Sequence, residues 1–141
     1  MRQSAHSREI FFVVISALSA AAHAAGDPAR GADLFQQNCA ACHSKEPGQH
    51  LVGPSLFSIV GRAAGSIAGF SYSAAMKRSG IVWTADRLMA YLKEPRRYLP
   101  GVKMMFPGLP DQRDREHVVA FLATLREDSP GSPNAADRRS P

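Results

Sequence analysis

The residues best suited to chemistry lie in one stretch of the chain, NCAACHSK, at positions 38–45. It holds the only two cysteines, Cys39 and Cys42, and His43 follows the second directly. Two thiols and an imidazole at this spacing suit three kinds of site: a redox-active disulfide, half of a zinc site, or an attachment point for haem.

The redox and zinc interpretations each lack a feature that they require. A redox-active C-x-x-C pair lies near a βαβ pattern with its thiolate at a helix N-terminus, whereas this pair follows a predicted helix and no strand precedes it. A zinc site needs a further spaced pair of ligands, and His50 and His117 stand alone. The C-x-x-C-H spacing is the attachment signature of c-type haem, so we favour haem.

The first 25 residues predict a secretory signal peptide. Arg2 and Arg8 precede the apolar run 10–22, and Ala22-His23-Ala24 has the small-x-small pattern of a cleavage site. The alternative is a retained anchor, but the run is short for a span of roughly 20 residues. We therefore expect cleavage at residue 25, and export to the oxidising periplasm, where haem c is attached in bacteria.

Length and charge narrow the class of protein. The chain has 141 residues, enough for one domain, with 17 Lys and Arg against 12 Asp and Glu. The basic residues are scattered singly or in pairs, which argues against nucleic-acid binding and for an acidic protein partner. One cysteine pair cannot supply a disulfide framework, and we expect a monomer.

The pattern predicts helices joined by long loops and no strand. Asp27-Pro28 begins a helix that runs toward Cys42, and a short helix covers Ser71–Ser79. Thr84 caps a helix over Ala85–Lys93, and Asp111 caps the last one. That last helix carries an apolar face formed by Val118, Phe121, Leu122 and Leu125.

Two long loops, 44–70 and 94–110, contain many prolines and glycines. Loops of this length in a small domain need something to pack against, and a haem would serve. The predicted domain covers 26–126, and the polar stretch 127–141 is expected to be a disordered tail.

A c-type haem used for electron transfer needs a sixth iron ligand, and the second loop offers PGVKMMF at 100–106. Methionine sulfur is soft and neutral, so it favours Fe(II). Side chains of neighbours in an extended loop diverge, so only one of Met104 and Met105 can face the iron. The alternative is that both fill gaps in the core.

These motifs, in this order, resemble a class I cytochrome c of the mitochondrial cytochrome c and bacterial cytochrome c2 type. The resemblance runs from about Gly31 to Leu125. Its motifs are GADLFQQNCAACH, GPSLFSIVGR, GFSYSAAMKRSGIVW, LMAYLKEPRRYLPGVKMMFPGL and HVVAFLATL. It implies a small all-α fold whose helices and long loops wrap around one covalently bound haem c.

The resemblance also implies roles for the attachment site and its ligands. Cys39 and Cys42 form the thioethers, and His43 is the proximal iron ligand. The family's ligand methionine follows Pro-Gly-x-Lys directly, which selects Met104. The region around Pro54 presents a backbone carbonyl to the N–H of the His43 imidazole and so fixes the orientation of the ring.

Further matches surround these ligands. The resemblance places Arg62, Tyr72 and Trp83 around the inner haem propionate, and Tyr91 beside the axial sulfur. It also places Gly31 and Phe35 where the first and last helices cross, with Phe121 opposite.

Two positions depart from the family. Val102 stands where a threonine commonly donates to the outer propionate, and Met76 stands where an asparagine often joins a water network near the axial sulfur. Both changes remove a polar partner, so the strength of the iron–sulfur bond is open at this point.

With both axial positions filled, the expected function is single-electron transfer rather than catalysis, with no catalytic residues. The resemblance implies a periplasmic carrier between redox partners of a respiratory or photosynthetic chain. The donor would be a quinol-oxidising complex or a periplasmic dehydrogenase, and the acceptor an oxidase, a reductase or a photosynthetic centre.

Such partners would dock weakly at the haem edge, where Arg96, Arg97 and Lys103 match part of the family's basic ring. For Lys45 and Arg78 a solvated surface is the better interpretation. Two alternatives stay open: a haem sensor or peroxidase-like protein with a displaceable sixth ligand, and a structural or binding module with a cysteine pair and no haem, which would be colourless.

Overall fold

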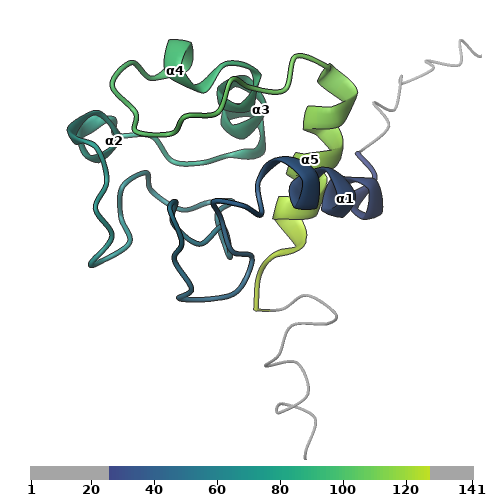
Figure 1. Cartoon of the computed structure of the whole chain (residues 1–141), viewed down its shortest axis with the longest axis horizontal. Coiled ribbons are helices and arrows are strands. Elements are labelled where there is room, and N and C mark those ends of the chain that lie inside the picture. Colours follow the sequence, from purple (N-terminus) through teal and green to yellow (C-terminus); the bar gives the residue numbers. More distant parts are fainter. Residues whose placement is uncertain (1–25, 128–141) are drawn as a thin grey trace, which may run out of the picture.

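The computed structural model describes residues 26–127, which form helices joined by long loops (Figure 1). The helices are α1 Pro28–Asn38, α2 Ala74–Arg78, α3 Ala85–Lys93, α4 Pro95–Tyr98 and α5 Gln112–Thr124. Within residues 26–127 there is no strand, only an isolated antiparallel bridge between Ala63 and Val82. The predicted signal peptide and all but the first residue of the predicted tail lie outside the described residues.

Helix α1 begins as predicted but ends earlier. The Asp27 side chain accepts from the Ala29 backbone N–H at 2.9 Å, and Pro28 takes the first helical position. At the other end, the N–H groups of Cys39 and Ala40 both donate to the Phe35 carbonyl. Sharing one carbonyl breaks the i→i−4 register, so the expected continuation toward Cys42 was wrong, and 39–42 form turns.

Helices α1 and α5 lie against each other at one side of the fold (Figure 1). A Cβ atom on Gly31 would lie 2.0 Å from the His117 carbonyl oxygen, so only glycine fits this crossing. The Phe35 and Phe121 rings meet with their centroids 5.4 Å apart. The predicted crossing of the first and last helices is therefore confirmed.

The buried face of α5 differs in part from the predicted one. Val118 and Leu122 are buried as expected, whereas Phe121 is only half-buried. Val119 and the charged Arg115 complete the buried face instead. The Asp111 carboxylate caps the helix by accepting from the Asp114 backbone N–H at 3.0 Å.

Helix α3 has the predicted bounds, with the Thr84 hydroxyl accepting from the Arg87 N–H. The predicted helix over Ser71–Ser79 is shorter, because Ser73 caps it and leaves 71–72 outside the helix. Helix α4 was expected to be loop. A single turn led by Pro95 contains no apolar period, so the sequence pattern could not reveal it.

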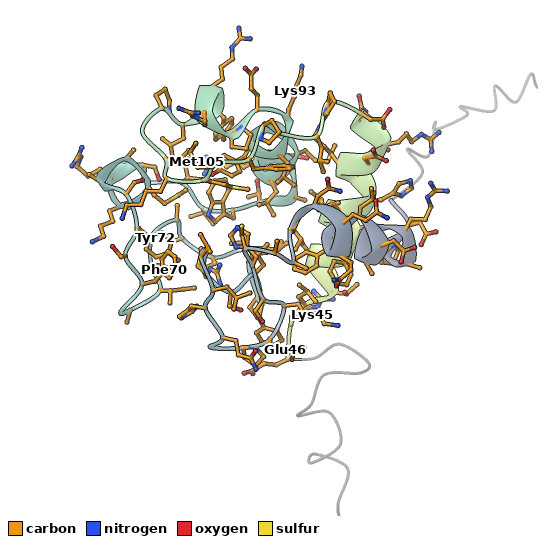
Figure 2. All side chains as sticks on the ribbon, viewed as in Figure 1. Lys45, Glu46, Phe70, Tyr72, Lys93 and Met105 are labelled. Carbon is orange, nitrogen blue, oxygen red and sulfur yellow. The ribbon has the colours of Figure 1, made fainter. Side chains whose placement is uncertain are left out.

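The loop of residues 39–73 forms the lower part of the molecule, below α2, α3 and α4 (Figure 1). It is fastened to α5 because the Ser58 N–H donates to the Leu125 carbonyl. Its far end carries Phe70 and Tyr72, whose rings meet edge to face 4.7 Å apart (Figure 2). Among the described residues, no helix is long and apolar enough to cross a membrane.

Candidate functional site

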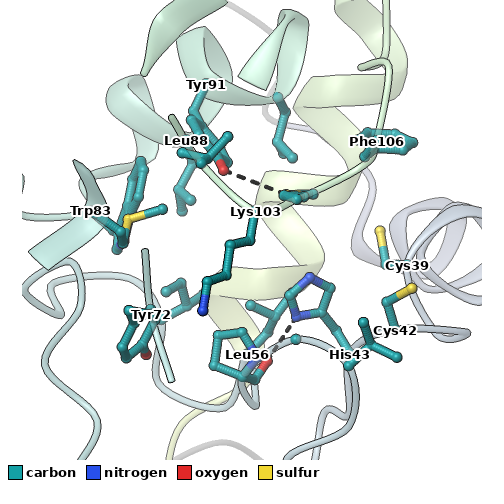
Figure 3. Close-up of a pocket in the computed structure, with 18 of the residues that line it drawn as sticks. Cys39, Cys42, His43, Leu56, Tyr72, Trp83, Leu88, Tyr91, Lys103 and Phe106 are labelled. Carbon is teal, nitrogen blue, oxygen red and sulfur yellow. Dashed lines mark hydrogen bonds between the residues drawn. The ribbon is translucent and has the colours of Figure 1, made fainter. Parts of the chain in front are cut away.

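A mainly apolar cavity of about 540 Å³ opens between the lower loop, α3 and the segment after α4 (Figure 3). Its walls carry the two cysteines, His43 and both methionines of the second loop. Further apolar side chains of the lining are Val52, Leu56, Ile59, Ala63, Phe70, Met76, Trp83, Leu88, Leu92, Val102, Phe106, Val118 and Leu122. The long loops thus enclose a space large enough for a substantial apolar group.

One nitrogen of His43 is held by the backbone. Its Nδ1 lies 2.7 Å from the Pro54 carbonyl oxygen, and since a carbonyl only accepts, Nδ1 carries the proton and Nε2 keeps a free lone pair. The pKa of His43 is lowered, chiefly by burial and also by the positive charge of Arg62, against an opposing effect of the Pro54 hydrogen bond. A neutral imidazole with one free nitrogen is the form that binds a metal.

The two thiols lie near the imidazole (Figure 3). Cys39 is buried and Cys42 is exposed, and both are free. Burial raises the pKa of the Cys39 thiol to about 11, and the neighbouring Cys42 adds to the shift. Both cysteines line the cavity, so two free thiols are at hand for thioether bonds to one group within it.

Tyr91 lies across the cavity from His43 (Figure 3). Its hydroxyl donates to the Met104 sulfur at 3.4 Å, which fixes that sulfur on the side opposite the imidazole. Met105, by contrast, is 82% exposed. The structure therefore brings Met104 rather than Met105 to face His43.

Arg62, Tyr72 and Trp83 come from separate segments and all line the cavity. The Arg62 guanidinium donates to the carbonyls of Ser55 at 2.9 Å and Phe57 at 3.0 Å. Burial lowers the pKa of Arg62 and raises the pKa of Tyr72. The structure thus gathers one cation and two neutral donors, a set that suits a carboxylate.

Met76 and Val102 are half-buried in the same cavity wall. Neither side chain offers a hydrogen-bond donor, and in residues 26–127 the Met104 sulfur is the one partner of the Tyr91 hydroxyl. This part of the wall is therefore apolar around a single polar contact.

Several parts of the wall were not predicted from the sequence. A Cβ atom on Gly53 would lie 2.2 Å from the His43 ring, so this glycine lets the backbone lie against the imidazole. The Gly-Pro pair was visible, but the contact was not. Leu88 and Leu92 flank Tyr91 on the buried face of α3, a helical spacing that could have revealed them.

Comparison with known proteins identifies the family. A family model described as Cytochrome c matches residues 28–126. The chain belongs to the cytochrome c family. The match to relatives named cytochrome c2 and cytochrome c places it in class I, as the sequence motifs predicted.

Three relatives illustrate this similarity. Cytochrome c2 of Rhodopila globiformis is 46% identical over 101 residues, which is 72% of this chain and 95% of the relative. Cytochrome c2 of Rhodomicrobium vannielii is 49% identical over 107 residues, 75% of this chain and 85% of the relative. The solved structure of cytochrome cH from Methylobacterium extorquens has a TM-score of 0.66 and 39% identity, and the match covers 70% of this chain and 99% of that one.

The cavity of this cytochrome c fits the family's cofactor, a covalently attached haem c. Two free thiols, an imidazole with a free Nε2 and a largely apolar wall supply what attachment and burial of the group require. The all-α fold, the haem c cofactor and electron transfer rather than enzymatic activity agree with the predictions.

Proposed function

We propose that this cytochrome c is a periplasmic carrier of single electrons whose haem iron is bound by His43 and Met104. The observation that carries the proposal is the placement of these two side chains across one cavity. Pro54 orients the imidazole of His43, and Tyr91 orients the sulfur of Met104. Both ligands are thus held by a hydrogen bond from outside the iron's own bonds.

In this proposal, Cys39 and Cys42 hold the haem through thioether bonds. The bound haem supplies a one-electron change between Fe(III) and Fe(II). His43 and Met104 would hold the haem iron from the protein side, and the apolar wall would exclude water from it. Because the same ligands serve both oxidation states, little has to move when the charge changes.

Arg62, Tyr72 and Trp83 are assigned to the inner propionate. A buried carboxylate is costly unless charged or polar donors surround it, and these three side chains reach the cavity from three segments. Tyr91 is assigned to the axial sulfur, where its hydroxyl is the donor.

The proposed docking surface consists of Arg96 and Arg97 on α4 and Lys103 at the cavity. All three are exposed, and the Lys103 ammonium donates to the Ser71 carbonyl at 2.9 Å. Lys45 is not part of this proposed surface, because it lies on the lower loop, at the opposite end of the molecule from α4 (Figures 1 and 2). A small interface with an acidic partner would form fast and separate fast.

The proposed partners are a quinol-oxidising complex or a periplasmic dehydrogenase as donor and an oxidase, a reductase or a photosynthetic centre as acceptor. Export by a cleaved signal peptide at residues 1–25 is part of the proposal, as are a domain at 26–126 and a tail at 127–141. The family match over 28–126 supports the domain. The charged n-region and apolar run support export.

The test is the visible and far-red spectrum of the mature protein, made with haem-attachment machinery and recorded oxidised and reduced. We expect a c-type spectrum with the weak far-red sulfur-to-iron band. A c-type spectrum without that band would indicate an open or replaced sixth position. It would favour the haem sensor or peroxidase-like alternative, which the apolar side chains at 76 and 102 leave room for. A colourless protein would refute both.

A further inference from the structure

A charged side chain lies on the buried face of α5. Arg115 is 8% exposed and shares that face with Val118, Val119 and Leu122. Its Nη1 donates to two consecutive backbone carbonyls, those of Leu109 at 2.6 Å and Pro110 at 2.7 Å. Its Nε is buried and has no hydrogen-bond partner in the described part of the chain.

Helix packing does not account for an arginine at this position. Taking a guanidinium out of water is costly, and a well-packed apolar side chain of similar volume is often as stable or more so. No carboxylate among residues 26–127 forms an ion pair with Arg115. The distinctive contribution of this side chain is therefore its pair of hydrogen bonds to the carbonyls of residues 109 and 110.

Those carbonyls end the segment that carries Met104. The Leu109 N–H donates to the Leu92 carbonyl at 2.8 Å, which ties the same point to α3. One residue earlier, a Cβ atom on Gly108 would lie 2.2 Å from the Lys93 carbonyl oxygen, so the chain is pressed onto the end of that helix. Three neighbouring residues thus fix this end of the segment.

The part of the segment that holds Met104 has few restraints of its own. Within the described residues, backbone atoms of 103–108 make no backbone hydrogen bond, and the contacts there come from side chains. The position of Met104 therefore depends on how firmly the segment is held at its two ends. Arg115 supplies two of the bonds at one end.

We propose that Arg115 is a positioning residue for the axial ligand, and that its bonds to Leu109 and Pro110 keep the Met104 segment closed over the cavity. This inference rests on the proposed role of Met104 as the sixth iron ligand. Loosening this end would raise the fraction of molecules in which Met104 has left the iron. An external ligand for Fe(III) would then bind more tightly, because its apparent affinity scales with that open fraction.

The experiment measures imidazole binding to the ferric holoprotein. Arg115→Met replaces the guanidinium group by an unbranched apolar side chain and leaves the Leu109 and Pro110 carbonyls without their donor. We expect the apparent affinity for imidazole to rise about tenfold. Arg115→Lys keeps the charge and a donor and should give a smaller rise. Arg113→Met, two residues away on an exposed position of the same helix, is the matched control and should behave as wild type.

A second readout separates positioning from general stability. The urea midpoint followed by helical circular dichroism reports unfolding of the whole domain. Because the bonds lost on opening of the segment are also lost on unfolding, we expect Arg115→Met to raise imidazole affinity by a factor no larger than the factor by which it shifts the unfolding equilibrium. A shifted unfolding equilibrium with unchanged imidazole affinity, or the same rise in affinity in Arg113→Met, would overturn the positioning role. Should Arg115→Met fail to fold, Arg115→Lys against Arg113→Lys decides the same point.

The far-red band of the wild-type protein distinguishes failure of the proposed function from failure of the proposed role of Arg115. Without that band, Met104 is not the ligand, and the proposed function and this inference both fail. With the band present and imidazole affinity equal in wild type and the Arg115 variants, only the role of Arg115 is wrong.

Discussion

The Tyr91 hydroxyl on α3 donates a hydrogen bond to the Met104 sulfur, thirteen residues along the chain, across 3.4 Å. The ring is buried and packs against Trp83 at 4.8 Å between centroids. Burial disfavours the phenolate and raises the pKa of Tyr91 to about 12. The hydroxyl therefore keeps its proton, and remains a donor to the sulfur, at every pH near neutrality.

Replacing Tyr91 by phenylalanine should lower the midpoint potential. The hydrogen bond draws electron density from the sulfur, and a poorer electron donor favours Fe(II). Losing a bond of about 0.5–1.5 kcal/mol corresponds to a fall of about 20–60 mV for one electron. Spectroelectrochemical titration measures it. The difference from wild type should stay constant between about pH 5 and pH 9, because the donor does not titrate there.

Tyr98→Phe is the control for this substitution. The Tyr98 ring lies edge-on to Tyr91 at 5.8 Å, but Tyr98 is partly exposed and is not a donor to the sulfur. The midpoint potential of Tyr98→Phe should therefore match that of the wild-type protein. An unchanged or higher potential in Tyr91→Phe would show that the hydrogen bond does not tune the iron.

The neighbouring methionines allow a direct test of the sixth ligand. Met104→Ala should keep haem attached, lose the far-red band and bind carbon monoxide rapidly in the ferrous state, because its sulfur faces the cavity. Met105→Ala should leave the spectrum unchanged, since this side chain is 82% exposed. If Met105→Ala alone abolishes the band, the ligand lies one residue further along the chain.

The parts of the fold that sequence predicted well depend on local chemistry. Thr84 and Pro95 delimit α3 because a cap and a proline act within one turn. The C-x-x-C-H motif marks the attachment site in the same way. The choice between the two methionines came instead from the resemblance, since the loop pattern alone left both open.

What the sequence did not reveal depends on contacts outside the regular helical hydrogen-bond pattern. The burial of Arg115 depends on the carbonyls of Leu109 and Pro110, which lie six and five residues earlier and outside α5, and a search for apolar periodicity passes over a charged residue even at helical spacing from Val118. The end of α1 depended on two N–H groups competing for the Phe35 carbonyl. The approach of Gly53 to His43 joins two points of one loop, and the spacing of the residues does not show it.

Substituting Gly53 by alanine should destabilise the proximal side. The added Cβ would lie 2.2 Å from the imidazole ring, so either the backbone or the ring must move. We expect a loss of about 1–3 kcal/mol in unfolding free energy, as for other overpacked sites. We also expect faster solvent exchange of the His43 Nδ1 proton, because displacing the ring or the backbone would weaken its 2.7 Å hydrogen bond to the Pro54 carbonyl. Urea titration and proton NMR measure the two effects.

Val52→Ala is the matched control next in sequence. Val52 is 81% exposed, so trimming it should change unfolding free energy by less than about 0.5 kcal/mol. A Gly53→Ala protein as stable as Val52→Ala, with an unchanged Nδ1 exchange rate, would mean that the loop moves away from His43 without cost.

The proposed docking arginines should contribute unequally. Arg97 lies 3.5 Å from Glu94, an ion pair of two exposed side chains, whereas Arg96 has no ion-pair partner within the described residues. The field of Arg97 is therefore partly cancelled. At low ionic strength, Arg96→Gln should slow oxidation by a multiply charged anionic oxidant about two- to threefold, and Arg97→Gln less.

Stopped-flow kinetics over a range of salt concentration measures this difference. The gap between Arg96→Gln and wild type should close as salt rises, because screening removes the steering but leaves electron transfer itself intact. Glu94→Gln supplies the reciprocal test: it releases Arg97 and should raise the rate at low salt. Arg126→Gln, beyond the end of α5, is the control for net charge alone. Equal slowing by Arg126→Gln and Arg96→Gln would show that overall charge, and not a docking surface on α4, guides the approach of the anion.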